Sequence, residues 1–126
     1  MYAWLYSLFS TPVSQQLEKM MFEKPNPEKA KSILESHTFD EIKSWRTKFA
    51  NHPILHEAAE QSPFYEGALC ILQLCWEDQR LRGLWNSDNY RDEYRFTVVG
   101  RLAMAYKNEE QPEFVKKIIS SHTVRI

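Results

Sequence analysis

Glycine is scarce in this sequence, and its scarcity limits the folds that the chain can adopt. Only three of the 126 residues are glycine, and neither Asn-Gly nor Asp-Gly occurs. These dipeptides form the tightest β-hairpin turns, and no sustained alternation of β-branched residues indicates strands elsewhere. Three glycines also leave little material for a loop that cradles phosphate groups. The sequence therefore predicts a helical protein and indicates no nucleotide-binding loop.

Cysteine and long apolar runs are scarce as well. In a helix, Cys70 and Cys75 are about 7.5 Å apart along the axis, beyond the roughly 7 Å that separates the Cα atoms of a disulfide. Free thiols with apolar neighbours are typical of a reducing compartment. No stretch approaches the roughly 20 apolar residues of a membrane span, and the apolar start Met1–Phe9 lacks the basic residues and cleavage site of a signal peptide. We therefore expect a cytoplasmic protein with no membrane span.

Neither a charge of one sign nor a catalytic motif dominates the sequence. Sixteen basic and seventeen acidic residues give a formal net charge of −1, which is untypical of a protein that binds nucleic acid through its overall charge. The sequence contains no G-x-S-x-G, P-loop, G-x-G-x-x-G or C-x-x-C motif. Nothing therefore specifies an enzyme, and we expect a non-enzymatic protein without a cofactor.

What the sequence does contain is helical periodicity. Apolar residues make up 43% of the chain, enough for the core of a single domain over residues 1–126. Prolines 12, 27, 53, 63 and 112 each open a segment with apolar residues at helical spacing, and proline is favoured in the first turn of a helix. We predict an all-α domain of about six to eight helices, at about residues 2–9, 12–23, 27–36, 39–50, 53–61, 63–82, 88–107 and 112–121.

The segment at residues 63–82 differs from the others because apolar residues cover nearly its whole circumference. From Phe64 to Trp76 almost every residue is apolar. A helix that is apolar all round is typically buried. We therefore predict that this helix is the buried centre of the domain, capped at Ser62 and ended by Gly83 in a left-handed conformation.

Two histidines and a glutamate recur at four-residue spacing around the predicted helix at residues 53–61. On an unbroken helix His52, His56 and Glu60 would share a face, and this set could bind zinc or iron. Pro53 opposes this arrangement, because the residue before a proline is pushed out of helical conformation. A metal-binding helical enzyme or sensor is therefore an alternative hypothesis, and surface histidines are the simpler interpretation.

Arginine and aromatic residues are interleaved in the second half of the chain. On a helix over residues 88–107, Tyr90, Tyr94, Thr97 and Arg101 would share one face. Arginine with tyrosine and tryptophan is the composition of interface hot spots, although the same side chains could instead pair with one another inside the fold. The predicted partner-binding residues are Trp85, Tyr90, Arg91, Tyr94, Arg95 and Arg101.

The leading hypothesis is a protein–protein interaction module, such as an adaptor, a chaperone, an inhibitor or immunity-type protein, or a small subunit of a larger assembly. The apolar helix at residues 2–9 would either fill a groove of the core or mediate homodimerisation. A nucleic-acid-associated subunit is a further alternative, disfavoured because acidic residues among the arginines would repel a phosphate backbone. Its contacts would be Arg80, Arg82, Arg91, Arg95 and Arg101.

Overall fold

Side chains that cap the first turns define where several helices begin. Thr11, Asn26 and Thr38 each accept a hydrogen bond from a backbone N–H in the first turn of the helix that follows. Each such cap satisfies a donor that the helix itself leaves unpaired. The helices that begin in this way are α2 (Pro12–Met20), α3 (Pro27–Glu35) and α4 (Phe39–Ser44).

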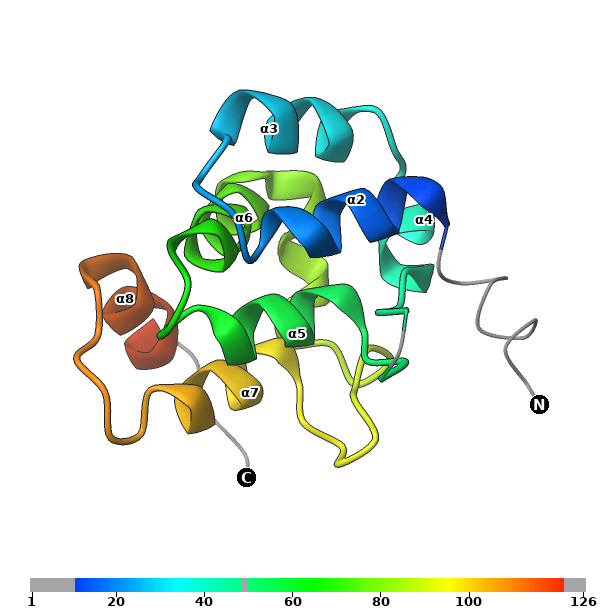
Figure 1. The fold of residues 1–126 in the computed structure, drawn as a ribbon. Coiled ribbons are helices and arrows are strands. Elements are labelled where there is room, and N and C mark those ends of the chain that lie inside the picture. The colour runs from blue at the N-terminus through cyan, green and yellow to red at the C-terminus, as the bar shows by residue number, and fades with distance from the viewer. Residues whose placement is uncertain (1–10, 49, 122–126) are drawn as a thin grey trace.

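The computed structural model describes residues 11–48 and 50–121, which form a single compact all-helical domain (Figure 1). In these ranges no strand is formed, and an isolated antiparallel β-bridge joins Arg46 to Pro53. The predicted all-α fold class is therefore confirmed. The remaining helices are α5 (Ile54–Gln61), α6 (Glu66–Glu77), the 3-10 helix η1 (Gln79–Leu84), α7 (Val98–Ala105) and α8 (Glu113–Ser121).

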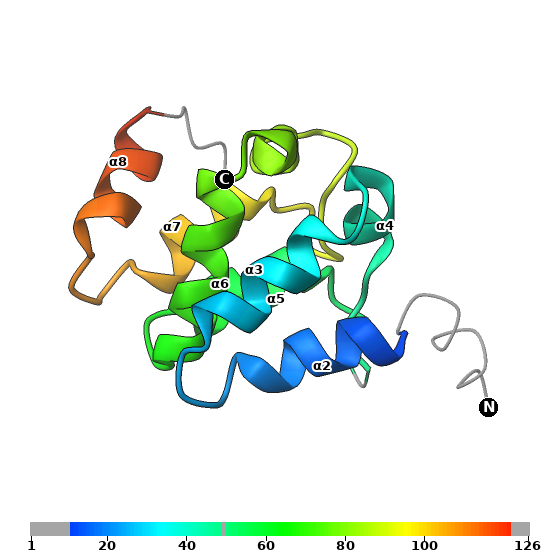
Figure 2. The same ribbon diagram turned by 90° about the horizontal axis from the view of Figure 1, so that it is seen from above.

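Helix α5 connects much of the packing of the domain. It packs against both α6 and α7 and also contacts α2 (Figures 1 and 2). α3 covers α6 and α8 packs against α7, so the outer helices are joined through these inner ones. Ile54, Leu55, Ala58 and Ala59 of α5 are all buried. The core therefore centres on α5 together with the inner face of α6.

The prediction of a central helix buried on every side is wrong in its detail. Helix α6 buries Ala68, Ile71, Leu72 and Cys75 along one face, whereas Gln73 is exposed. Its neighbours, which are α3, α5, η1 and the end of α2, leave the apolar residues outside this face half-buried. A segment with apolar residues on all sides of its predicted helix is therefore not necessarily surrounded by other helices.

Both predicted ends of that central helix also differ from the structure. The helix begins after the exposed residues Phe64 and Tyr65, and Ser62 instead donates a hydrogen bond to the Ala59 carbonyl at the end of α5. Gly83 lies inside η1 with a φ outside the left-handed region. The span predicted for one helix at residues 63–82 is thus divided among a turn, α6 and η1.

The predicted helix at residues 88–107 is wrong over its first half. Residues 88–97 form a loop, and α7 begins only at Val98 because the Thr97 side chain caps the N–H of Gly100. Asp92 bonds local backbone N–H groups in a non-helical arrangement, as aspartate commonly does outside helices. The helix face that Tyr90, Tyr94, Thr97 and Arg101 were expected to share therefore does not exist.

Two expectations concern membranes and the N-terminus. Among residues 11–48 and 50–121, none of the helices combines the length and the hydropathy of a bilayer-spanning segment. The predicted helix at residues 2–9 lies outside the described residues. Homodimerisation through it stays a prediction.

Gly67 of α6 lies directly against the backbone at the end of α2. A Cβ atom at this position would lie 2.4 Å from the carbonyl oxygen of Met20, 2.8 Å from that of Met21 and 2.5 Å from that of Glu23. Backbone atoms cannot move aside as a flexible side chain can. The end of α2 therefore rests directly on the first turn of α6.

We expect the substitution Gly67→Ala to lower the free energy of unfolding by about 3 kcal/mol, because the added methyl group forces the two helices apart. Urea unfolding followed by circular dichroism measures this change. Gly83→Ala is the matched control, since a Cβ there would meet Phe39 at an ordinary 3.5 Å. Equal stability of the two variants would contradict the tight α2–α6 contact.

Candidate functional site

The carboxylate of Asp92 organises the loop at residues 88–97, which we call the Asp92 loop. Its Oδ1 accepts hydrogen bonds from the backbone N–H groups of Tyr94 at 3.0 Å and Phe96 at 2.9 Å. The backbone closes the same turn, since the N–H of Asp92 donates to the carbonyl of Phe96 and the N–H of Arg95 donates to the carbonyl of Asp92. One side chain therefore fixes the course of five consecutive residues.

Arg101 of α7 anchors this arrangement to the domain. Its Nε donates to Asp92 Oδ2 at 3.0 Å, and its terminal nitrogen donates to the same oxygen. Burial opposes ionisation of Asp92, but the bonds from Arg101 and from the Phe96 N–H hold the pKa of its carboxyl below the usual value. Asp92 is therefore a buried carboxylate, and its partners come from its own loop and from Arg101 of α7.

The outer side of the Asp92 loop carries an exposed aromatic ring and an unusual backbone. Tyr94 is 68% exposed. Arg95 has a φ of 67°, a left-handed conformation that is uncommon for residues other than glycine. The Arg101 guanidinium lies 4.8 Å from the ring centre of Phe96 and 5.6 Å from that of Tyr94. Tyrosine and arginine side chains thus gather around the fixed turn.

The six predicted partner-binding residues separate into two groups. Trp85 and Tyr90 are buried in the core. The Trp85 ring stacks edge-on against Trp76, and the Tyr90 hydroxyl accepts a hydrogen bond from the N–H of Leu55. Their side chains therefore pack in the core, on the inner side of the Asp92 loop. The four residues at or near the surface are Arg91, Tyr94, Arg95 and Arg101.

His56 joins the Asp92 loop to α5 from the inner side. Its Nε2–H donates to the carbonyl of Phe96 at 2.8 Å, and its ring packs edge-on against Tyr90. The side chain is buried, and burial lowers its pKa to about 4. His56 is therefore a neutral packing residue, and it does not meet His52 as the predicted metal site required.

A second cluster of ionisable groups lies where α5 begins. His52 Nδ1 is 2.9 Å from Glu57 Oε2, and His52 Nε2 is 3.3 Å from Glu93 Oε1. Donor atoms of His52, Glu57 and Glu60 all lie within 4.8 Å of one another. Burial opposes protonation of His52, but its bonds to Glu57 and Glu93 raise the pKa of the imidazole above its usual value. Of the three residues in the alternative metal hypothesis, His52 and Glu60 lie close together, and the third member of the cluster is Glu57 instead of His56.

Sequence reasoning missed Asp92, Glu57 and Glu93. Pro53 could have pointed to Glu57. Because a residue before proline is displaced from the helix, the residue of α5 that meets His52 need not be four positions further along the chain. Glu93 lies on a loop far along the chain, and its approach to His52 depends on tertiary packing. Asp92 and Arg101 are nine residues apart, a separation that no helical pattern singles out.

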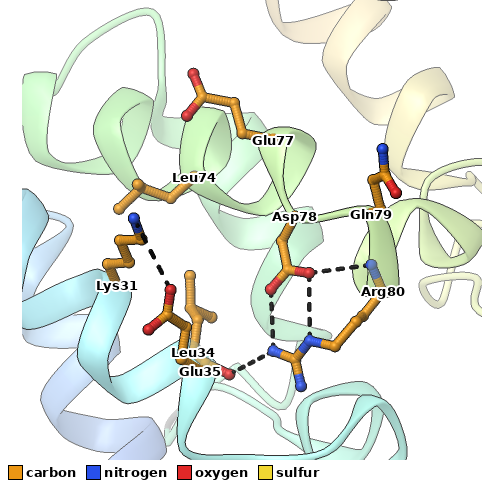
Figure 3. A pocket seen from close by; sticks show the side chains of 8 residues that line it. All are labelled: Lys31, Leu34, Glu35, Leu74, Glu77, Asp78, Gln79 and Arg80. Atoms are coloured by element: carbon orange, nitrogen blue, oxygen red, sulfur yellow. Dashed lines mark hydrogen bonds and ion pairs between the residues drawn. The ribbon is translucent and has the colours of Figure 1, made fainter.

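A cavity of about 330 Å³ lies between α3 and the end of α6 (Figure 3). Four of its five charged side chains are paired with one another, Lys31 with Glu35 and Asp78 with Arg80. Arg80 also donates to the carbonyls of Leu34 and His37, the last of which lies just beyond α3. These bonds make Arg80 a structural tie between α3 and η1.

Arg82 is likewise engaged within the fold. Its Nε donates to the Trp76 carbonyl at 2.7 Å, and its guanidinium lies 4.5 Å from the centre of the Trp76 ring. Arg91 donates to Asp88 and to the carbonyl of Arg95. Four of the five arginines considered for nucleic-acid contact therefore have intramolecular partners, Arg80, Arg82, Arg91 and Arg101.

In comparisons with known proteins, no family model, no curated protein and no solved structure matches this chain.

We expect Asp92→Asn to lower the free energy of unfolding by about 2 kcal/mol, because an amide leaves the Arg101 charge without its counter-ion. Denaturant unfolding measures the loss, and amide hydrogen exchange at residues 94–96 should speed up. Asp88→Asn is the control, since Asp88 pairs with Arg91 in solvent and its side chain is 89% exposed. Slow exchange that persists in Asp92→Ala, which removes the acceptor of the Tyr94 and Phe96 N–H groups, would contradict the organising role of Asp92.

The buried neutral state of His56 predicts a pH dependence of stability. An unfolded chain protonates His56 near pH 6.5, whereas the folded chain does so only near pH 4. The unfolded state therefore gains a proton first as the pH falls from 6.5 to 4, and stability declines across that window by up to about 3 kcal/mol. Urea unfolding at pH 7, 5.5 and 4.5 should show a steeper decline for the native sequence than for His56→Gln. Identical slopes would contradict this assignment.

Proposed function

We propose that this chain is a non-enzymatic protein–protein interaction module that binds its partner through the Asp92 loop together with Arg101. The observation that carries the proposal is an exposed Tyr94 on a backbone that Asp92 already fixes. A loop that is ordered before binding loses little conformational entropy when a partner docks. An adaptor, a chaperone, an inhibitor or immunity-type protein and a small subunit of a larger assembly would all use such a surface.

Backbone strain at Arg95 supports this role. A residue other than glycine in the left-handed region costs of order 1–3 kcal/mol, and such residues cluster at binding sites. Here the cost is offset by the hydrogen bonds that Asp92 accepts from both flanking residues, Tyr94 and Phe96. Among the described residues nothing pairs with the Arg95 guanidinium, in contrast to the paired Arg91 and Arg101. Its charge is thus available to a carboxylate on a partner.

The composition of the surface also supports protein binding over nucleic-acid binding. Tyrosine and arginine are enriched in interface hot spots, where flat rings and forked donors make contacts at low entropic cost. A nucleic-acid surface needs several unpaired cations aligned with phosphates, whereas Arg80, Arg82, Arg91 and Arg101 are engaged within the domain. Glu93 adds a negative charge within the same loop.

We expect Tyr94→Ala and Arg95→Gly each to weaken partner binding by about 30-fold or more, as hot-spot truncations of about 2 kcal/mol do. Glycine at position 95 keeps the left-handed backbone and removes only the side chain. The partner is captured with the native chain, identified by mass spectrometry, purified and titrated against each variant by calorimetry. The unfolding free energy of both variants should stay within about 0.5 kcal/mol of the native value or rise for Arg95→Gly.

Phe64→Ala is the matched control for this experiment, because Phe64 is 65% exposed but lies at the α5–α6 connection. It should leave the affinity unchanged. If Phe64→Ala abolishes binding while Tyr94→Ala and Arg95→Gly do not, the partner surface lies elsewhere on the domain and the proposal fails.

A further inference from the structure

The cluster at the start of α5 begins with a histidine whose backbone is held in place. The N–H of His52 donates to Thr47 Oγ1 at 3.0 Å, and the carbonyl of His52 accepts from the N–H of Thr47 at 2.8 Å. Thr47 is buried, and the β-bridge between Arg46 and Pro53 continues the same pairing. The imidazole therefore projects from a rigid point of the chain.

Two carboxylates of α5 converge on this imidazole. Glu57 and Glu60 are three residues apart on a helix, so their side chains lie on neighbouring positions of one face. Glu57 is oriented on both oxygens, by His52 at Oε2 and by the side-chain amide of Gln61, which donates to Oε1 at 3.2 Å. Among the described residues the Glu60 carboxylate has neither a hydrogen bond nor an ion pair, although one of its oxygens lies within 4.8 Å of the ligand atoms of His52 and Glu57.

We propose that His52, Glu57 and Glu60 bind a divalent transition-metal ion, with Glu93 accepting a hydrogen bond from the ring nitrogen that faces away from the metal. One nitrogen and two carboxylate oxygens within 4.8 Å form a three-ligand set that a small closing movement brings to coordination distance. Such a mixed set suits Zn²⁺, Mn²⁺ or Fe²⁺ better than Cu⁺, which prefers sulfur. Three protein ligands leave a position open to water or to a carboxylate of a partner.

The arrangement around His52 supplies the outer contacts that metal-binding histidines usually have. His52 Nδ1 is directed at Glu57, and Nε2 is directed at Glu93. A carboxylate on the far ring nitrogen fixes the tautomer and the orientation of a ligating imidazole. The side-chain amide of Gln61 likewise fixes the orientation of the Glu57 carboxylate. Surface histidines on a short helix would not require either contact.

The charge balance also favours a cation at this place. Three carboxylates surround one imidazole, so even a protonated His52 leaves the cluster with a net negative charge. In the described part of the chain, the ion pairs of Glu57 and Glu93 are both made with His52. A divalent ion would relieve the mutual repulsion of the carboxylates.

Titration of the full chain, with any affinity tag removed, tests this proposal directly. Isothermal calorimetry with Zn²⁺ should give one site per chain, and excess Zn²⁺ should raise the melting temperature by several degrees in a way that EDTA reverses. His52→Gln and Glu60→Gln should each weaken Zn²⁺ binding by at least tenfold. Glu93→Gln should weaken it by a smaller factor, because only the outer hydrogen bond is lost.

Glu60→Gln is the decisive variant, because Glu60 makes no described interaction that folding depends on. Glu109→Gln, which alters an exposed carboxylate on another segment, is the matched control and should bind Zn²⁺ like the native chain. Absence of binding to Zn²⁺, Mn²⁺ and Fe²⁺ at millimolar concentration would overturn the proposal, as would Zn²⁺ binding that survives both His52→Gln and Glu60→Gln. The titration requires no partner protein, so its result is independent of the proposed interaction function.

Discussion

The buried carboxylate of Asp92 is the constraint on which the loop side of this domain depends. It satisfies two backbone N–H groups of its own loop and the guanidinium of Arg101 at the same time. An isolated buried charge would be costly, and the four donors on its two oxygens are what make this one tolerable. The position of the loop relative to α7 follows from this single group.

Helix α5 contributes a residue to each of the two candidate sites. His56 faces inward and holds the Phe96 carbonyl at the end of the Asp92 loop, whereas Glu57 faces His52. Glu93 belongs to the same loop and contacts His52 from outside. The two clusters therefore share one short helix and one loop.

The sequence was informative about the starts of three helices. Proline and the capping residues Thr11, Asn26 and Thr38 locate the starts of three helices, because each satisfies its own first turn. Periodicity failed at residues 88–97, where Tyr90 is drawn into the core and Asp92 captures backbone N–H groups. A helical pattern in apolar residues does not report such competition, since an aspartate that bonds the backbone resembles one on a solvated face.

The candidate sites were less accessible to sequence reasoning for a related reason. Composition drew attention to the arginines and aromatic residues of the second half, but could not separate Trp85 and Tyr90, which are buried, from Tyr94, which is exposed. That distinction follows from the turn at Asp92. Similarly, His52 and Glu60 were identified by spacing, whereas Glu57 and Glu93 depend on where the chain turns before α5 and after η1.

The direct contact between α2 and Gly67 has a consequence for tracing the ancestry of this fold. Side chains in a core exchange readily for others of similar volume, but a position where a Cβ would lie 2.4 Å from a carbonyl oxygen strongly disfavours any residue other than glycine. Gly67, Asp92 and Arg101 together form a small set of positions. We expect these positions to stay the same in related proteins whose other residues have changed. Distant descendants of the same ancestor would then be identifiable by these few fixed positions rather than by overall similarity.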